Sequence, residues 1–304
     1  MEKISTLIHE LHSGNNRALA RCITIVENEL EGSEEILKQL KPSKAPAIIG
    51  VTGPPGAGKS TLINSLISFL SKQNLRIGVI AIDPTSPFNY GSLLGDRVRM
   101  SEHFTDENVF IRSLATRGSL GGLSSKTIEI TDVMKSAGFD YIIVETVGVG
   151  HSEVEIVGLA DTTVLVLVPE SGDEVQSLKS GIMEIADIFV VNKSDRPGAS
   201  GFLKNLHQLV HQHDPEKWTP KIVRAVATKN EGVEELFENI QLHLAQRTTK
   251  NRALLYAEKA YQIIQSRRMK SVSKKILTEK ISEYFIKGDF NLYRFVEEIE
   301  SSKK

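Results

Sequence analysis

A glycine-rich stretch at residues 50–61, GVTGPPGAGKST, carries the strongest chemical signal in the chain. Gly53, Gly58, Lys59 and Ser60 fit the spacing G-x-x-x-x-G-K-[ST], which is typical of loops that hold nucleotide phosphates. Glycines let backbone amides approach a phosphate without a clash from Cβ, and the start of the following helix adds positive potential. Lys59 is expected to reach the outer phosphates and to act in catalysis, and Ser60 is expected to bind Mg²⁺. The alternative is a glycine-rich turn that only ends a strand.

The surroundings of this loop favour phosphate binding. It follows the apolar run AIIGVT and precedes the amphipathic run TLINSLISFLS, so the order is strand, loop and helix, as the motif requires. We therefore expect the nucleotide phosphates to contact the whole loop: Gly53, Pro54, Pro55, Gly56, Ala57, Gly58, Lys59, Ser60 and Thr61.

A second motif, NKSD at residues 192–195, ends the apolar strand DIFVV and is expected to select the base. The Asp195 carboxylate can accept two parallel hydrogen bonds from the ring N–H and the exocyclic amine of guanine, whereas adenine offers no matching pair of donors. Asn192 is expected to tie strands together, and Lys193 to stack its stem on the base. In the segment AVATKNEGVEEL, the Ala227 amide is expected to meet the guanine carbonyl oxygen. These residues favour GTP and GDP, and the alternative for a lone four-residue match is a polar loop after a strand.

Three carboxylates between these motifs are expected to lie at the γ-phosphate side. Asp83 ends the apolar run RIGVIAI, Asp96 follows thirteen residues later, and Glu145 ends FDYIIVET. Glu145 begins the phrase ETVG, where many GTPases carry the aspartate of an Asp-x-x-Gly turn, and the Gly148 amide is expected to contact the γ-phosphate. Mg²⁺ prefers oxygen ligands and keeps several of its waters, so we expect the carboxylates to bind the metal or position water. The alternative for each is helix capping or solvation of a strand end.

The residues after Gly148 predict slow hydrolysis. Ras-like enzymes carry a water-orienting glutamine there, whereas Val149, Gly150 and His151 follow in this chain. For His151 a surface position at a helix start is favoured over a role in orienting water. GTPases that lack a complete set of catalytic groups can be as slow as roughly 10⁻⁴ per second. We therefore predict a low basal rate of GTP hydrolysis that a partner protein raises.

Short apolar runs alternate with longer helical patterns through the middle of the chain. Such runs are typical of a buried parallel sheet built from βαβ crossovers. Seven strands are predicted, at residues 47–52, 76–82, 108–113, 139–146, 162–168, 187–192 and 221–227. The predicted fold class is α/β, a doubly wound, mostly parallel P-loop GTPase core with N- and C-terminal helical extensions. The predicted boundaries are 1–44 for the first extension, 45–248 for the GTPase domain and 249–304 for the second.

Composition narrows the class of protein and its partners. The 304 residues carry 37 basic and 38 acidic side chains, a formal net charge of -1, so no global field favours nucleic acid or an anionic membrane. Cys22 is the single cysteine, which excludes an internal disulfide and a zinc site built from cysteines. No apolar run has the roughly 18 residues of a membrane span, and the first residues lack the apolar centre of a signal peptide. A cytoplasmic location is expected.

The motifs together resemble one family. The phrases RALARCITIVE, GVTGPPGAGKSTLI, DPTSPFNYGSLLGDRVRM, TRGSLGGLS, ETVGVGHSEVE, PESGDEVQSLKSGI and NKSD are similar to the MeaB/ArgK family of GTPases, to which the human methylmalonic aciduria type A protein is related. The similarity runs from about residue 15 to about residue 245 and keeps both order and spacing. After about residue 250 the chain matches the family only in helical character.

The resemblance implies a GTPase chaperone for adenosylcobalamin-dependent acyl-CoA mutases, chiefly methylmalonyl-CoA mutase, that assists cofactor loading, protection or reactivation. It also implies a homodimer formed largely by the terminal helices. Carried over by position, Asp83, Asp96 and Glu145 are the acidic residues of the active site. Asp173 and Lys179 match a further switch through which the nucleotide state reaches the mutase.

The resemblance leaves two other functional classes open. One is a GTPase for metal-centre assembly, which a set of Cys and His ligands would distinguish, and this chain largely lacks such a set. The other is a kinase linked to amino-acid transport, which needs an acceptor pocket with a base, and no segment identifies one. The chain departs from the family at Glu170 and Ser171, where small residues are more usual, and in a short C-terminus.

Overall fold

The computed structural model describes two units of the chain, Met1–Tyr256 and Ala257–Lys304. The described residues are 2–41, 45–83, 100–115, 125–146, 156–171, 185–210, 218–246, 256–257, 260–261, 263–265, 267–269, 272–288 and 290–301. Among the helices of these ranges, none combines the length and the apolar character that a bilayer crossing requires.

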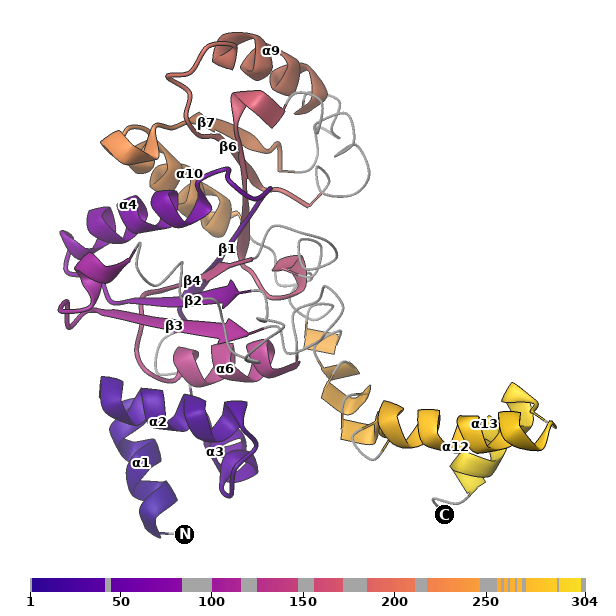
Figure 1. The fold of residues 1–304 in the computed structure, drawn as a ribbon. Helices are drawn as coiled ribbons and strands as arrows, with labels where there is room; N and C mark the ends of the chain where they lie inside the picture. The colour runs from indigo at the N-terminus through magenta and orange to yellow at the C-terminus, as the bar shows by residue number, and fades with distance from the viewer. Residues whose placement is uncertain are drawn as a thin grey trace. The chain divides into compact units, whose positions relative to one another are not determined.

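The first unit contains one sheet of seven parallel strands (Figure 1). The strands are β1 (Ala47–Thr52), β2 (Ile77–Asp83), β3 (Val109–Ala115), β4 (Tyr141–Glu145), β5 (Thr162–Leu167), β6 (Ile188–Val191) and β7 (Lys221–Arg224). Each overlaps one of the seven predicted strands, so the predicted α/β fold with a parallel sheet is confirmed. The sheet order is β3-β2-β4-β1-β5-β6-β7, so the chain builds one side of β1 first and then crosses to the other. Parallel sheets bind ligands at such a crossing point, at the carboxyl ends of the strands.

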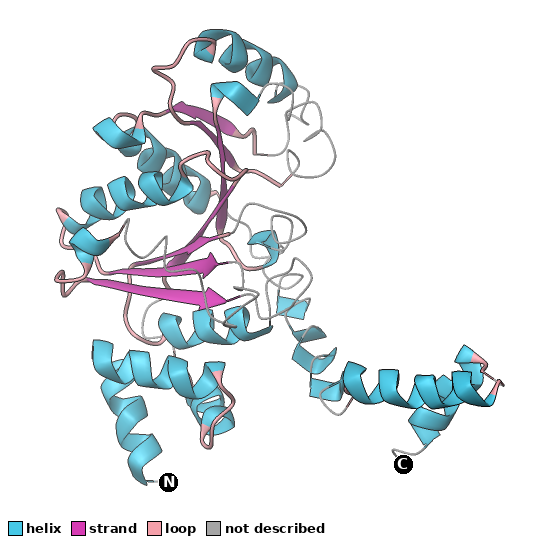
Figure 2. Cartoon of the chain, in the orientation of Figure 1, coloured by secondary structure: helices cyan, strands magenta, loops and turns pink. Residues whose placement is uncertain are grey.

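Helices cover both faces of the sheet (Figures 1 and 2). On one face lie α4 (Lys59–Ser71) and α10 (Val233–Ala245), and on the other lie α6 (Ser125–Lys135) and α9 (Ala199–Val210). The 3₁₀ turns within the described ranges are η1 (Ser101–His103), η2 (Ile156–Gly158), η3 (Pro169–Ser171) and η4 (Ala227–Lys229).

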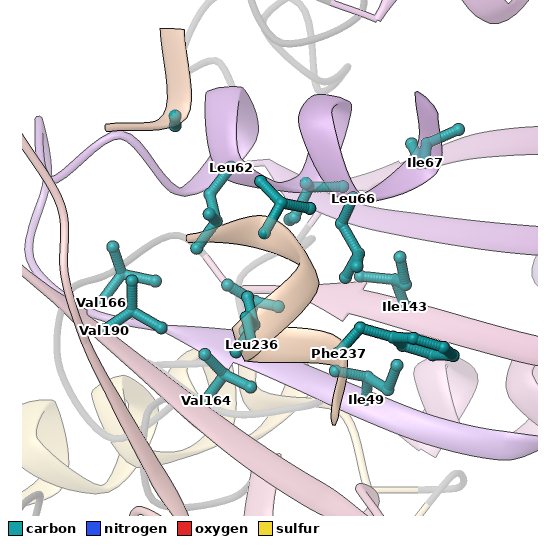
Figure 3. Close-up of a cluster of buried hydrophobic side chains, with 14 of the residues drawn as sticks. Ile49, Leu62, Leu66, Ile67, Ile143, Val164, Val166, Val190, Leu236 and Phe237 are labelled. Carbon is teal, nitrogen blue, oxygen red and sulfur yellow. The ribbon is translucent and has the colours of Figure 1, made fainter. Parts of the chain in front are cut away.

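Alternation along the strands explains why both faces need helices. In β5, Val164 and Val166 belong to the cluster that α4 and α10 complete, whereas Leu165 and Leu167 belong to the cluster with α9. Figure 3 shows the first cluster, in which Leu236 and Phe237 of α10 lie among side chains from the strands and from α4. Successive residues of a strand point to opposite faces, so an apolar strand is stable only when both faces are covered.

The N-terminal extension is helical, as predicted, with α1 (Glu2–His12), α2 (Asn16–Glu27) and α3 (Ser33–Gln39). Asn15 caps α2 by accepting hydrogen bonds from the Arg17 and Ala18 amides, at 2.9 and 3.1 Å. Arg76, just before β2, donates to the Gly14 carbonyl at 2.9 Å and so joins the extension to the sheet. Cys22 is buried in α2, and burial raises the pKa of its thiol to about 11. This cysteine is therefore a core residue with an unreactive, protonated thiol.

The second unit contains α12 (Lys274–Lys287) and α13 (Leu292–Ser301). Gly288 ends α12 with a φ of +76°, a left-handed conformation that glycine adopts easily. Aromatic rings then pack the two helices together, because Tyr284, Phe290 and Phe295 lie within ring-contact distance of one another. The aromatic cluster holds α12 and α13 as a helical hairpin.

The leucines of α10 allow a direct test of the core. Leu236 is 1% exposed and Leu242 is 54% exposed, on the same helix. We expect Leu236→Ala to lower the free energy of unfolding by about 2–5 kcal/mol, because it leaves a cavity in a close-packed core. Leu242→Ala should change it by less than about 0.5 kcal/mol. Urea denaturation followed by the fluorescence of Trp218, the single tryptophan, measures both, and equal effects would contradict the assignment of this core.

Candidate nucleotide site

The predicted phosphate loop lies between β1 and α4, at the carboxyl end of the strand where the chain changes sides. Its glycines are required by space as well as by conformation. Gly53 and Gly58 have φ values of +137° and +87°. A Cβ on Gly53 would lie 2.1 Å from the Val166 carbonyl oxygen of β5, and one on Gly58 would lie 2.4 Å from Nδ2 of Asn192. The loop therefore passes against its neighbours so closely that side chains at these two positions would clash.

Lys59 and Ser60 begin α4 and are buried. The Lys59 ammonium donates to the carbonyl oxygens of Gly53 at 2.8 Å and Pro54 at 3.2 Å, which holds it across the loop. The Ser60 hydroxyl donates to Oε1 of Glu145 at 2.7 Å. Glu145 reaches this position because it ends β4 in register with Val51 of β1. The serine and the carboxylate, both buried, form an oxygen donor set of the kind that Mg²⁺ prefers.

The remaining acidic candidates are described only in part. Asp83 is the last residue of β2, two positions beyond Ala81, which pairs with Glu145 across the sheet. Its backbone therefore lies at the same edge as the phosphate loop, and its side chain lies outside the described residues. Five further predicted positions also lie outside them: Asp96, Gly148, His151, Asp173 and Lys179.

The buried side chain of Asn192 joins the phosphate loop to the turn after β7. Its Nδ2 donates to the Ala57 carbonyl oxygen at 2.9 Å. Its Oδ1 accepts from the amides of Lys193 at 2.8 Å and Ala227 at 3.1 Å. The NKSD motif is therefore connected to both other loops of the site through one amide side chain.

The Ala227 amide differs from its predicted role. The sequence predicts that this N–H contacts the guanine carbonyl oxygen, whereas in the structure it is buried and donates to Asn192. The reason is the 3₁₀ turn η4, whose first amide faces inward while the next residue, Thr228, is exposed.

Lys193 and Asp195 extend from the same loop toward the expected position of the base. Lys193 has a φ of +53°, and its ammonium donates to the Gly56 carbonyl oxygen at 2.7 Å, so its aliphatic stem bridges the two loops. The Asp195 side chain is 44% exposed, and its Oδ2 lies 3.3 Å from Nζ of Lys229. A partly exposed carboxylate with a neighbouring cation is well placed to receive donors from a ligand.

Sequence reasoning missed an ion pair beside this loop. Arg196, directly after the motif, pairs with Glu170 in η3, the turn that follows β5. The hydrogen bond from Arg196 holds the pKa of the Glu170 carboxyl below its usual range. At pH values above its usual pKa the Glu170 carboxyl is therefore ionised and the pair is formed. The pair is lost as the pH falls through the lowered pKa. Both side chains are about half exposed, so the contribution to stability is small. No motif predicted this contact, because the partners are 26 residues apart.

Comparison with known proteins supports a guanine-nucleotide site. A family model described as methylmalonyl Co-A mutase-associated GTPase MeaB matches residues 19–283. A protein of Pyrococcus abyssi named as a GTPase is 47% identical over 293 residues, covering 94% of this chain and 89% of that protein. The GTPase ArgK of Escherichia coli is 32% identical over 298 residues, and the match covers 94% of this chain and 87% of ArgK. The mouse methylmalonic aciduria type A homolog is 38% identical over 78% of this chain and 57% of that protein.

A solved structure shares the fold. The crystal structure of a LAO/AO transport system kinase has a TM-score of 0.69 and 22% identity, and covers 99% of this chain and 97% of that one. At this identity the likeness concerns the arrangement of helices and strands.

Proposed function

Since the chain belongs to the MeaB family of GTPases and hydrolyses GTP, we propose that it serves as a chaperone for an adenosylcobalamin-dependent acyl-CoA mutase, with methylmalonyl-CoA mutase as the first candidate. The observation that carries this proposal is the family match over residues 19–283, which includes every loop of the site. The mouse relative supports the same client, because it is named for methylmalonic aciduria. The chaperone would assist cofactor loading, protection or reactivation.

The base contacts we propose follow from the NKSD loop. Asp195 would accept from the ring N–H and the amine of guanine, and the stem of Lys193 would lie along the ring. The guanine carbonyl oxygen needs a donor, and we assign it to the amide of Thr228, because the Ala227 amide is engaged by Asn192. The phosphates of GTP or GDP would lie along residues 53–61.

The residues present fit Mg²⁺, and we propose that Ser60, Glu145, Asp83 and Asp96 hold it directly or through water. A bound Mg²⁺ neutralises charge that develops on the phosphates. Lys59, the first residue of α4 at the end of the loop, would add positive charge at the β- and γ-phosphates. The Gly148 amide would contact the γ-phosphate. The low basal rate of GTP hydrolysis, inferred from the residues that follow Gly148, remains our prediction.

The client would raise this rate. Asp173 and Lys179 belong to the segment that follows β5 and η3, and we propose that this segment carries the nucleotide state to the mutase. The turn η3, which directly precedes this segment, is held to the base loop by the Glu170–Arg196 pair.

We further propose that residues 249–304 form a homodimer. The support lies in the surface of the second unit, where large apolar side chains are exposed on α12 and α13. They are Ile276, Phe285, Ile286, Leu292, Tyr293 and Val296. A contiguous exposed apolar patch usually marks a protein interface, and we propose that these side chains form one.

The two alternatives have less support. In the described residues no group of three or more His, Cys, Asp or Glu side chains is arranged to hold a metal ion, as a metal-delivery GTPase would need. The kinase named among the solved structures shares the fold only.

Changing Asp195 to asparagine tests the base assignment. Asparagine offers one acceptor and one donor, which match the N–H and the C2 carbonyl of xanthine but not the two donors of guanine. We expect Asp195→Asn to weaken GTP binding by roughly two orders of magnitude or more and to strengthen XTP binding. Titration calorimetry measures both. Asp132→Asn, the same change on α6, should alter neither, and unchanged GTP affinity in Asp195→Asn would refute the assignment.

Capture of the client tests the chaperone proposal. The tagged full-length chain, loaded with a non-hydrolysable GTP analogue, should recover an acyl-CoA mutase from an extract of its own organism. Saturating that mutase should then accelerate single-turnover GTP hydrolysis by at least about tenfold, because the client supplies order or charge to the site. Release of labelled γ-phosphate as free phosphate distinguishes hydrolysis from kinase activity. Recovery of a nickel enzyme or a permease, or a rate unchanged by the mutase, would count against the proposal.

The exposed face of α12 tests the dimer. Ile286 is 87% exposed, so Ile286→Asp should change the stability of the hairpin little. The substitution places a charge in the proposed interface. We expect the variant to raise the dimer dissociation constant at least about tenfold in analytical ultracentrifugation. Leu242→Asp, an exposed leucine of the first unit, is the matched control. A wild-type chain that stays monomeric at all concentrations would show that the interface does not exist.

A further inference from the structure

Two buried threonines lie where the phosphate loop and the ETVG turn leave the sheet. Thr52 is the last residue of β1 and directly precedes Gly53, and Thr146 directly follows Glu145. The Thr146 hydroxyl donates to the Thr52 hydroxyl at 2.9 Å, and the two residues are 1% and 0% exposed. The Thr146 amide also donates to the Val51 carbonyl oxygen at 3.1 Å. Neither threonine is among the residues assigned above to phosphate, metal or base.

Alternation along the strand relates this pair to Glu145. Ile143 and Val51 belong to the core on the α4 face, so Glu145 turns to that same face and meets Ser60. Thr146 turns to the opposite face and meets Thr52. A shift of one residue at the end of β4 would exchange the two faces and carry the Glu145 carboxylate away from Ser60. The hydroxyl pair opposes such a shift, because it is formed only when Thr146 faces Thr52.

Burial alone does not explain two hydroxyls here. A buried polar pair that is replaced on both sides by apolar groups of the same shape is often nearly neutral for stability, and valine has the shape of threonine. Two valines would fill the same space, but their apolar contact is not directional as a hydrogen bond is. A hydrogen bond between the last residue of one strand and the first residue beyond its neighbour sets the relative position of the two loops that follow.

We propose that the Thr52–Thr146 pair is a positioning element for the triphosphate state. It holds the start of the ETVG turn against the start of the phosphate loop, so that Glu145 stays at Ser60 and the turn begins at a set distance from the γ-phosphate. The diphosphate is held by the loop itself and depends less on the turn. The pair therefore affects the affinity for GTP more than the affinity for GDP. The inference rests on the proposed guanine-nucleotide site and is independent of the client.

Valine and serine substitutions separate positioning from folding. Thr146→Val keeps the shape and removes the donor, and we expect it to lower the ratio of GTP-analogue to GDP affinity by about tenfold, measured with Mg²⁺ by titration calorimetry. Thr146→Ser keeps the hydroxyl and should keep most of the native ratio. The double variant Thr52→Val with Thr146→Val leaves no buried hydroxyl unpaired, so it should fold stably and still show the lowered ratio.

Thr131→Val on α6 is the matched control. Thr131 is also fully buried, and its hydroxyl donates to the Thr127 carbonyl oxygen at 2.7 Å. This variant should lose thermal stability with no change in the affinity ratio. If Thr146→Val and the double variant also keep the native ratio and lose only stability, the pair is structural and the inference is wrong. A wild-type chain that binds no guanine nucleotide would instead overturn the site itself, and the inference with it.

Discussion

The hydrogen bonds of one buried amide side chain hold the site together. Asn192 donates to the phosphate loop at Ala57 and accepts from the turn at Ala227, so segments separated by 135 and 35 residues meet at a single side chain. The contact leaves no room for a side chain at Gly58, whose Cβ would collide with the same amide. The glycine of the phosphate motif and the asparagine of the base motif are therefore two halves of one packing constraint. A parallel sheet that places β1 beside β5, and β5 beside β6, makes their meeting possible.

The same sheet places the residues proposed for the two ends of the nucleotide on different strands. On one side of β1, β4 brings Glu145 to Ser60 and Thr146 to Thr52. On the other side, β5 closes against Gly53, and β6 leads into the NKSD loop. The residues proposed to sense the triphosphate and those proposed to recognise the base thus lie on opposite sides of β1. The strand β1, which leads into the phosphate loop, pairs directly with both β4 and β5.

The second unit has a different physical character. The first unit buries its large apolar side chains between a sheet and two layers of helices, whereas α12 and α13 share one small aromatic cluster and leave other apolar side chains exposed. A hairpin of two helices has too little interior to cover its own apolar surface. The exposed residues of α12 and α13 are therefore the natural place to seek a protein interface in this chain.

The sequence by itself determined the fold class, the seven strands and the motifs that we propose bind phosphate and base. These depend on short-range patterns, such as the apolar run before Gly53 and the spacing from Gly53 to Lys59, which a single chain displays directly. Only the tertiary structure decided which groups meet: the amide of Ala227 with Asn192, the carboxylate of Glu170 with Arg196, and the hydroxyl of Thr146 with Thr52. Such contacts join residues far apart in the sequence. Which residues meet depends on the strand order and on the face of the sheet that each side chain occupies. Local spacing in the sequence determines neither.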